Sequence, residues 1–200
     1  MSTGSKLVKT AVGSLMLLGL MMIATVPGFA RDKYETIDAQ VYGTGTQLGQ
    51  NIGVTLIIYD FSTQADRQVL VDAFTKGQNQ GLVNALQKMP AVGRMAITGT
   101  VGSDVAFIRM IPTPTGRTIR FATNRQIRIG EAWSDSPTQA FNLTCGEIII
   151  NDQDKSKSAG TLYPAAQLTI NKEGQLSFEL NQNPWRLGGI IDWSGTQGVN

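Results

Sequence analysis

Residues 62–90 read STQADRQVLVDAFTKGQNQGLVNALQKMP, and they are the one stretch of the chain in which apolar residues recur at helical spacing. Thr63 followed by Asp66 matches the Ser/Thr-x-x-Asp/Glu start signal, in which a hydroxyl and a carboxylate satisfy free backbone N–H groups. Gly77 predicts a stop, because glycine accepts the left-handed conformation that often follows a last turn. A second helix is predicted after it and ends before Pro90, since the residue before a proline avoids helical geometry. The stretch therefore predicts a pair of short helices.

Helices this short are marginal alone, so we expect the pair, an insert at about residues 63–89, to pack on strands. The insert would be either a cap that seals a sheet or a lid and docking face. The rest of the chain alternates apolar and polar residues between turn signals. Strands are predicted at 36–41, 54–61, 95–101, 104–111, 117–123, 126–133, 139–151, 167–170, 175–180 and 188–193, with 117–123 and 126–133 as either two strands or one long bent ribbon. This pattern predicts an α+β fold, mainly antiparallel, with about eight or nine strands in a barrel or sandwich and the helices after the second strand.

The first thirty residues predict a secretory signal peptide. Lys6 and Lys9 form a short basic region, an apolar run follows, and Gly28 and Ala30 are the small residues that a cleavage site needs. The run is short and rich in small residues for a membrane span, and an uncleaved anchor is the alternative. We therefore expect residues 31–200 to form a single exported domain, periplasmic or extracellular.

The charge balance gives no support for nucleic-acid binding. The full chain has 17 Lys and Arg against 15 Asp and Glu, and removing the leader's two lysines leaves 15 against 15. A neutral chain lacks the basic patch that phosphate-backbone binding requires. Candidate partners are an anionic small molecule, a glycan or an envelope protein.

The residue inventory excludes several chemistries. The chain has no histidine, which removes Ser-His-Asp and Cys-His catalysis and histidine-bearing metal sites. Cys145 is the only cysteine, so no intrachain disulfide forms, and its apolar neighbours favour a buried thiol over a nucleophile. Nucleotide-binding glycine loops are absent as well. We predict no cofactor and no metal site.

Three strings resemble an uncharacterised family of exported bacterial proteins: ITGTVG at 97–102, RFATNR at 120–125 and NPWRL at 183–187. The resemblance covers most of the chain after the leader. It implies export and a single domain, and it carries no activity, ligand or catalytic residue.

Arginines supply the best candidate ligand site. In an extended segment Arg120 and Arg128 share one face, and two forked guanidiniums can hold a carboxylate, sulfate or phosphate. The alternative is a solvated face on which arginines discourage edge pairing. Trp185 and Arg186 form a second candidate, since an exposed tryptophan can stack on a sugar ring or anchor an interface. Core packing is the alternative for Trp185.

The acidic residues leave one enzymatic hypothesis open, hydrolysis by a pair of carboxylates. A pair of carboxylates can hydrolyse a glycosidic bond without histidine. The acids weighed for that role are Asp60, Glu131, Glu147 and Glu179. Residues 151–154, NDQD, lack the glycine and distal glutamate of a calcium loop and predict a polar turn.

The sequence therefore predicts a non-enzymatic binding or interaction module of the cell envelope. A secreted hydrolase using two carboxylates is the alternative, and a structural component of the cell surface is a third. No catalytic residue is assigned.

Overall fold

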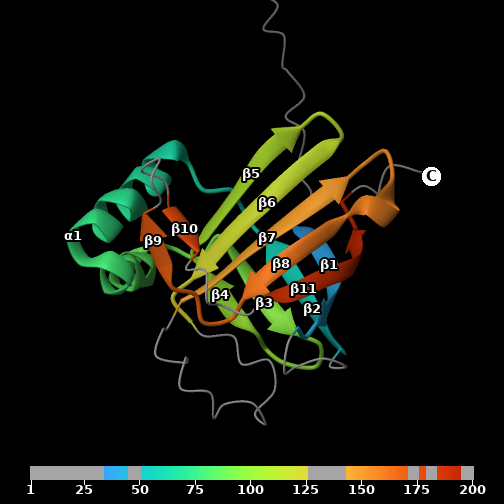
Figure 1. Ribbon diagram of the computed structural model, residues 1–200, viewed down its shortest axis with the longest axis horizontal. Coiled ribbons are helices and arrows are strands. Elements are labelled where there is room, and N and C mark those ends of the chain that lie inside the picture. Colours follow the sequence, from blue (N-terminus) through green and yellow to red (C-terminus); the bar gives the residue numbers. More distant parts are fainter. Residues whose placement is uncertain (1–33, 45–50, 126–142, 171–175, 179–183, 195–200) are drawn as a thin grey trace, which may run out of the picture. The chain divides into compact units, whose positions relative to one another are not determined.

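The structure is a computed structural model that describes residues 34–44, 51–125, 143–170, 176–178 and 184–194 (Figure 1). All of these lie in one compact unit, residues Arg31–Asn200. The predicted leader, the predicted strand at 126–133 and the site candidate Arg128 lie outside the described residues. Within the described part of the chain, no helix is both long enough and apolar enough to cross a membrane.

Most of the unit is one antiparallel sheet of nine strands in the order β4-β3-β2-β1-β11-β8-β7-β6-β5. A short hairpin, β9 with β10, forms a second sheet. The strands are β1 (Glu35–Tyr42), β2 (Asn51–Ile58), β3 (Gly93–Ile97), β4 (Ser103–Val105), β5 (Phe107–Thr113), β6 (Gly116–Thr123), β7 (Thr144–Asn151), β8 (Ala159–Tyr163), β9 (Leu168–Ile170), β10 (Leu176–Phe178) and β11 (Trp185–Asp192). The mainly antiparallel class predicted from the alternation is confirmed.

The sheet curls into a barrel-like form because its two outermost strands are consecutive in sequence. Only Ala106 separates β4 from β5, so the predicted strand at 104–111 is bent into two parts. The first part pairs with β3 and the second with β6. Across the bend, the Thr123 hydroxyl of β6 donates to the Asp104 carbonyl of β4 over 2.7 Å. The bent segment therefore brings the two ends of the sheet together and limits exposed edges.

The interior of the barrel is apolar and comes from alternate residues of the long strands. Sixteen buried residues form one cluster: Ile37, Ala39, Val41, Val54, Leu56, Ile58, Met95, Val105, Ile108, Ile119, Phe121, Ile148, Ile150, Leu162, Trp185 and Leu187. The two-residue period of a strand places these side chains inside and their neighbours outside. Hydrophobic burial in this cluster is the main stabilising contribution that the described residues show.

Gly146 is a point of close packing in the interior of the barrel. A glycine inside a strand pattern predicts a bulge, but the register runs through Gly146 without a shift, with Phe121 opposite Gly146 and Gly146 opposite Leu162. A Cβ at this position would lie 2.2 Å from Cζ of Phe121. The expected bulge is therefore wrong, and the glycine is needed because the Phe121 ring lies against its backbone.

The helical insert follows β2, as predicted, and is assigned as one helix, α1 (Gln64–Lys88). Thr63 is its N-cap and forms the expected capping box with Asp66: the Asp66 N–H donates to Thr63 Oγ1 over 3.2 Å, and the Thr63 N–H donates to Asp66 Oδ2 over 2.7 Å. The Thr63 hydroxyl also donates to Asp66 Oδ2 over 2.7 Å, and the two bonds that Oδ2 accepts, from the N–H and the hydroxyl of Thr63, lower the pKa of the Asp66 carboxyl. Met89 caps the other end, directly before Pro90.

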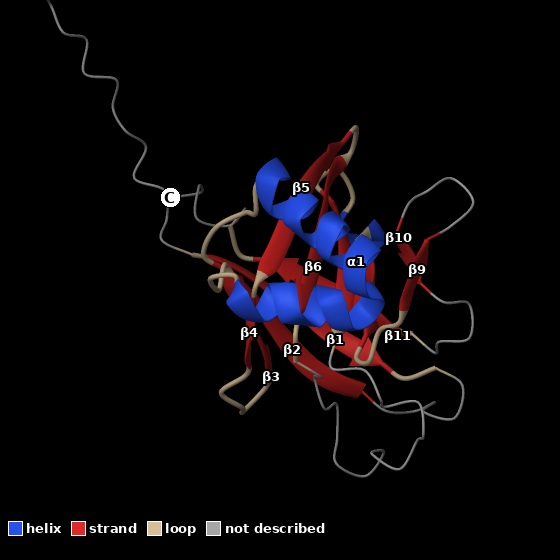
Figure 2. Ribbon diagram, turned by 90° about the vertical axis from the view of Figure 1, so that its left-hand side faces the viewer, coloured by secondary structure: helices blue, strands red, loops and turns tan. Residues whose placement is uncertain are grey.

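The expected pair of separate helices is not confirmed, since α1 is a single helical element with a sharp internal kink (Figure 2). Gly77 and Gln78 leave helical geometry, and Gln78 has φ 51° and ψ −145°. That conformation is strained for a residue with a side chain. The Asn79 amide holds the kink in place, because it donates to the Leu168 carbonyl and accepts from the Leu168 N–H of β9.

Helix α1 packs on the outer face of the sheet and not into the barrel. Its buried residues are Leu70, Phe74, Leu82 and Leu86. They share a second apolar cluster with an outer row of residues that lie opposite one another on β5, β6, β7 and β8: Phe107, Ala122, Cys145 and Tyr163. The helix therefore caps one region of the outer surface.

Candidate functional site

Strand β6 carries two arginines on opposite faces of the sheet, and each belongs to a different charged group. Arg117 has the parity of Ile119 and Phe121 and points to the barrel interior, whereas Arg120 points outward. We call the group around Arg117 the inner cluster (Glu35, Arg117, Asp192 and Ser194). We call the outer row that contains Arg120 the outer stripe.

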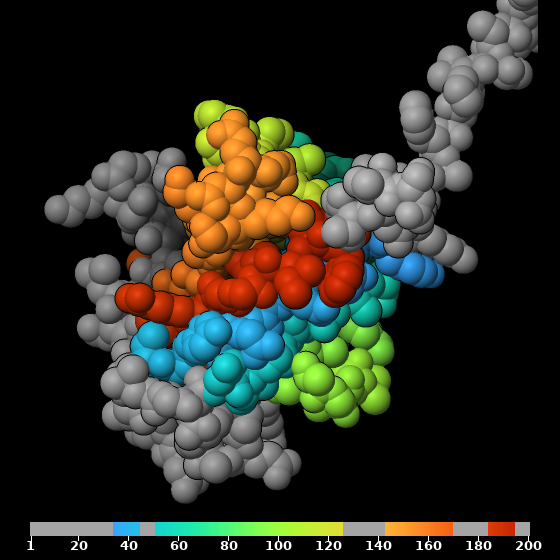
Figure 3. Space-filling model, turned by 90° about the vertical axis from the view of Figure 1, so that its right-hand side faces the viewer, coloured from blue at the N-terminus to red at the C-terminus, as the bar shows by residue number. Residues whose placement is uncertain are grey.

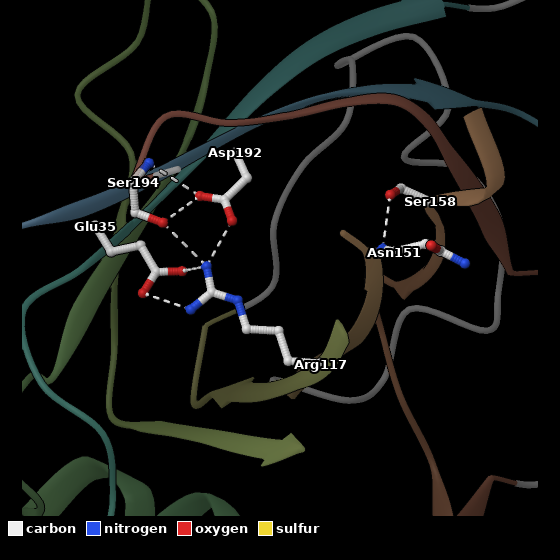
Figure 4. A network of polar contacts seen from close by, with 6 residues as sticks. All are labelled: Glu35, Arg117, Asn151, Ser158, Asp192 and Ser194. Carbon is white, nitrogen blue, oxygen red and sulfur yellow. Dashed lines mark hydrogen bonds and ion pairs between the residues drawn. The ribbon is translucent and has the colours of Figure 1, made fainter. Parts of the chain in front are cut away.

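The inner cluster joins three strands through one guanidinium (Figure 4). Arg117 Nη2 lies 2.6 Å from Asp192 Oδ2 and 2.5 Å from Glu35 Oε1, and Nη1 donates to Glu35 Oε2 over 3.2 Å. Nη2 also donates to Ser194 Oγ over 3.1 Å, and that hydroxyl donates to Asp192 Oδ1 over 2.6 Å. The Arg117, Glu35 and Asp192 side chains are only 21%, 14% and 13% exposed.

The cluster crosses the interior of the barrel. In the sheet order, β8 and β7 stand between β11 and β6, and β1 lies beyond β11. Arg117 therefore reaches its partners on β1 and β11 across the barrel and not along the sheet. It ties the first residue of β1 and the last residue of β11 to the start of β6 at one end of the barrel.

A bulge in β11 brings Asp192 to the inner face. Between the pairs Gln40–Gly188 and Asp38–Ile191 the register shifts, so that Ala39 alone faces two residues of β11. Gly189 sits at this bulge with φ 55°, a left-handed conformation that glycine adopts without strain. Without the extra residue, alternation from Leu187 would place Asp192 on the outer face.

Two carboxylates compete for one guanidinium in the inner cluster, so negative charge exceeds positive charge when both carboxylates are ionised. Burial raises the pKa of Glu35, the charge of Arg117 lowers it, and the charge of Asp192 raises it. The net result is a raised pKa. Burial alone would lower the pKa of Arg117, but the two carboxylates outweigh it and the pKa is raised. Glu35 Oε1 lacks an aligned hydrogen-bond donor although Arg117 Nη2 is close, so this contact is ionic. The neutral form of Glu35 is favoured more than in water.

The inner cluster also contains a close pair of carboxylates, the arrangement that acid–base hydrolysis requires. Glu35 Oε1 and Asp192 Oδ2 lie 2.5 and 2.6 Å from the same nitrogen, so they are at most 2.5 + 2.6 = 5.1 Å apart. Retaining glycosidases hold two carboxyl groups about 5–5.5 Å apart. Here, however, the guanidinium occupies the space between them, where a scissile bond would have to lie.

The outer stripe is a row of polar residues that face one another across six adjacent strands. It lies two residues along each strand from the apolar row that α1 covers, and it is formed by Arg109 (β5), Arg120 (β6), Glu147 (β7), Thr161 (β8), Arg186 (β11) and Tyr42 (β1). Figure 3 shows β11 at the surface between β1 and the segment of β7 and β8. The stripe therefore borders the region that the helix caps.

Charge on the stripe is unequally paired. Arg120 Nε donates to Glu147 Oε2 over 2.5 Å. Arg109 and Arg186 have no ion pair within the described ranges. Arg109 lies directly opposite Arg120, and like charges in that position destabilise a sheet. Three guanidiniums thus share one carboxylate, and the stripe carries a net charge of about +2 at neutral pH.

Of the site residues predicted from sequence, those that the structure describes lie on two different faces of the sheet. Arg120 and Arg186 do lie in the same outer row, although the sequence placed them in different candidates. Trp185 is 2% exposed and packs in the barrel interior, so a ligand on the outer face does not reach it. We leave Trp185 out of the site, while Arg128 lies outside the described residues.

The remaining sequence candidates have structural roles where they are described. Cys145 is buried under α1, and burial raises the pKa of its thiol to about 12, which keeps it protonated at neutral pH. Asn151 accepts from the N–H groups of Gln153 and Asp154, so the NDQD segment is a polar turn. Of the four acids considered for hydrolysis, Glu147 pairs with Arg120 and Asp60 is exposed. Glu131 and Glu179 lie in the part that is not described.

The inner cluster was not predicted from the sequence, although one signal was available. Arg117 has the same parity as Ile119 and Phe121, so simple alternation places a charge on the apolar face. Such a charge requires a buried partner.

Comparison of the chain with protein-family models, with curated proteins and with solved structures finds no match.

Proposed function

We propose that the chain is an exported, non-enzymatic binding module of the cell envelope that holds an anionic ligand on the outer face of its barrel. The observation that supports this proposal is the direct opposition of Arg109 and Arg120. This like-charge contact costs stability, since only Arg120 has a carboxylate partner, and an anion placed between the two guanidiniums would offset that cost. Forked guanidiniums suit carboxylate, sulfate and phosphate groups in particular.

Binding is tested by calorimetric titration of the full chain with sodium sulfate and with a digalacturonate, at low and at physiological salt. We expect weak binding that falls as ionic strength rises. The double variant Arg109→Gln/Arg120→Gln should abolish it. Arg94→Gln is the matched control, because Arg94 is also a surface arginine on a strand and pairs with Asp104 over 3.0 Å. Equal binding by both variants, or no binding by the unaltered chain, would overturn the proposal.

Export is supported by the charge and apolar pattern of residues 1–30. Expression of the full chain in a bacterium followed by intact-mass measurement tests it. We expect the product to begin at Arg31 and to be recovered outside the cytoplasm. An uncleaved chain in the membrane fraction would instead support the anchored alternative.

A hydrolase with two carboxylates remains a second candidate because Glu35 and Asp192 lie so close together. This function would require Arg117 to leave the space between them. Screening the chain against chromogenic glycosides tests it. Turnover that disappears in both Glu35→Gln and Asp192→Asn would favour the enzyme, and turnover that survives both changes would exclude this pair.

A further inference from the structure

Tyr42 gives the far end of the outer stripe a different chemistry. Its side chain is 41% exposed, and it stands directly opposite Arg186. A Cβ built on Gly188 would lie 3.2 Å from Cε2 and 3.8 Å from Cδ2 of Tyr42. The ring therefore lies over a glycine of β11, against the sheet, and keeps part of its surface open to solvent. An aromatic ring held in this way offers an apolar platform beside a cation.

The two ends of the stripe are separated by a distance that a single small anion cannot span. Arg120 is on β6 and Arg186 is on β11, with β7 and β8 between them. Three strand spacings of about 4.8 Å give a separation of roughly 14 Å along the sheet. Glu147, which pairs with Arg120, and the small side chain of Thr161 lie along this path. The stripe therefore presents two cationic positions separated by one carboxylate and one small polar residue.

We propose that the ligand of the outer stripe is a linear acidic glycan that lies across the strands. This inference rests on the proposed anion-binding function and extends it from one end of the stripe to the other. One acidic group pairs with Arg109 and Arg120, and a later one pairs with Arg186. A sugar ring near that second group packs on Tyr42.

The combination of charge and platform favours a glycan over other polyanions. The flat face of a sugar ring can cover an aromatic ring, and Tyr42 is the member of the stripe that provides one. Glu147 remains between the cations, which disfavours a ligand with closely spaced charges such as a nucleic acid backbone. The chain outside its leader also has no net positive charge. An acidic peptide becomes the competing outcome of the test.

The test compares galacturonate oligomers of two and eight residues with polyglutamate of similar charge, in calorimetric titrations of the full chain. We expect the octamer to bind at least about tenfold more tightly than the dimer at equal uronate concentration, because the second contact forms within an existing complex. Arg186→Gln and Tyr42→Ala should each remove this length advantage, whereas Arg94→Gln, which lies outside the stripe, should retain it. Tyr42→Phe should retain it, and circular dichroism should verify the fold of each variant.

The outcomes separate this inference from the function on which it rests. Equal affinity for dimer and octamer overturns the extended ligand but leaves anion binding at Arg109 and Arg120 intact. Polyglutamate that binds as tightly as the octamer, with no effect of Tyr42→Ala, overturns the glycan. Failure of every anion to bind overturns the proposed function itself.

Discussion

Arg117 and Arg120 lie three residues apart on one strand, and their surroundings give the same chemical group two different uses. Arg117 is enclosed with two carboxylates in the barrel interior, whereas Arg120 is largely exposed beside one. A buried charge has lost most of its hydration, so its stability depends on the oppositely charged groups around it. An exposed charge keeps its water and can exchange one partner for another.

This difference supports a structural role for the inner cluster and is the basis on which we propose recognition at the outer stripe. In the cluster, one guanidinium satisfies groups from three strands and closes one end of the barrel. In the stripe, three guanidiniums meet one carboxylate, and the excess charge is available to a ligand.

The largest effect is expected for Arg117→Met. The change leaves Glu35 and Asp192 facing each other with little water and no counter-ion. Removing one partner of a buried ion pair costs about 3–5 kcal/mol, and partial exposure places this cluster near 3 kcal/mol. Urea unfolding followed by circular dichroism measures the loss.

Arg120→Met is the matched control on the same strand. Its pair with Glu147 is 60% and 35% exposed, so we expect a loss below about 1 kcal/mol. Equal losses for the two variants would contradict the contrast between the inner and outer arginines.

Gly146→Ala tests the register that separates the inner face from the outer face. The new Cβ would meet the Phe121 ring, and overpacking of this kind costs about 1–3 kcal/mol. Gly77→Ala is the control, since a Cβ there would meet nothing within 4 Å. The midpoint of thermal unfolding measures both, and a neutral Gly146→Ala would mean that β7 is not packed in this register.

Local signals in the sequence were sufficient for much of the fold. The Thr63 and Asp66 capping box, the end of α1 before Pro90 and the alternation of the long strands are short-range patterns, and the structure contains all three. The bulge expected at Gly146 was wrong because a strand glycine has two explanations. Only the packing of Phe121 from the neighbouring strand decides between a bulge and a close contact.

The candidate site was harder to predict because its members come together through long-range pairing. Arg120 and Arg186 were both identified, but their common row depends on the strand order. Asp192 could not be predicted as a buried partner of Arg117, because the bulge at Gly189 reverses the face of β11 on which Asp192 lies. Parity alone would have placed that carboxylate outside.

Glu35→Gln gives a smaller effect whose sign depends on pH. The raised pKa of Glu35 means that the folded chain holds this proton more tightly than the unfolded chain. Ionised Glu35 therefore lowers stability as pH rises through its folded pKa, above the usual value of 4.5. Glutamine mimics the protonated form beside Arg117 and Asp192.

We thus expect the stability difference, variant minus unaltered chain, to increase between pH 4 and pH 7. Urea unfolding at both values measures it. Asp66→Asn should show little change between these values and the opposite trend below pH 4, because the pKa of Asp66 is lowered from 3.8 in the folded chain. A difference for Glu35→Gln that falls with pH would mean that its charge stabilises the cluster.

Glu147→Gln is expected to change stability least, by less than about 0.5 kcal/mol, and yet to change binding. Glu147 competes with any anion for Arg120, so its neutralisation raises the charge of the stripe from about +2 to about +3. We expect sulfate and digalacturonate to bind about threefold more tightly at low salt, with the gain reduced by screening at higher salt. Asp104→Asn frees Arg94 in the same way and should leave this binding unchanged. If both variants raise affinity equally, the ligand responds to net charge alone, and the outer stripe is no more a site than the rest of the surface.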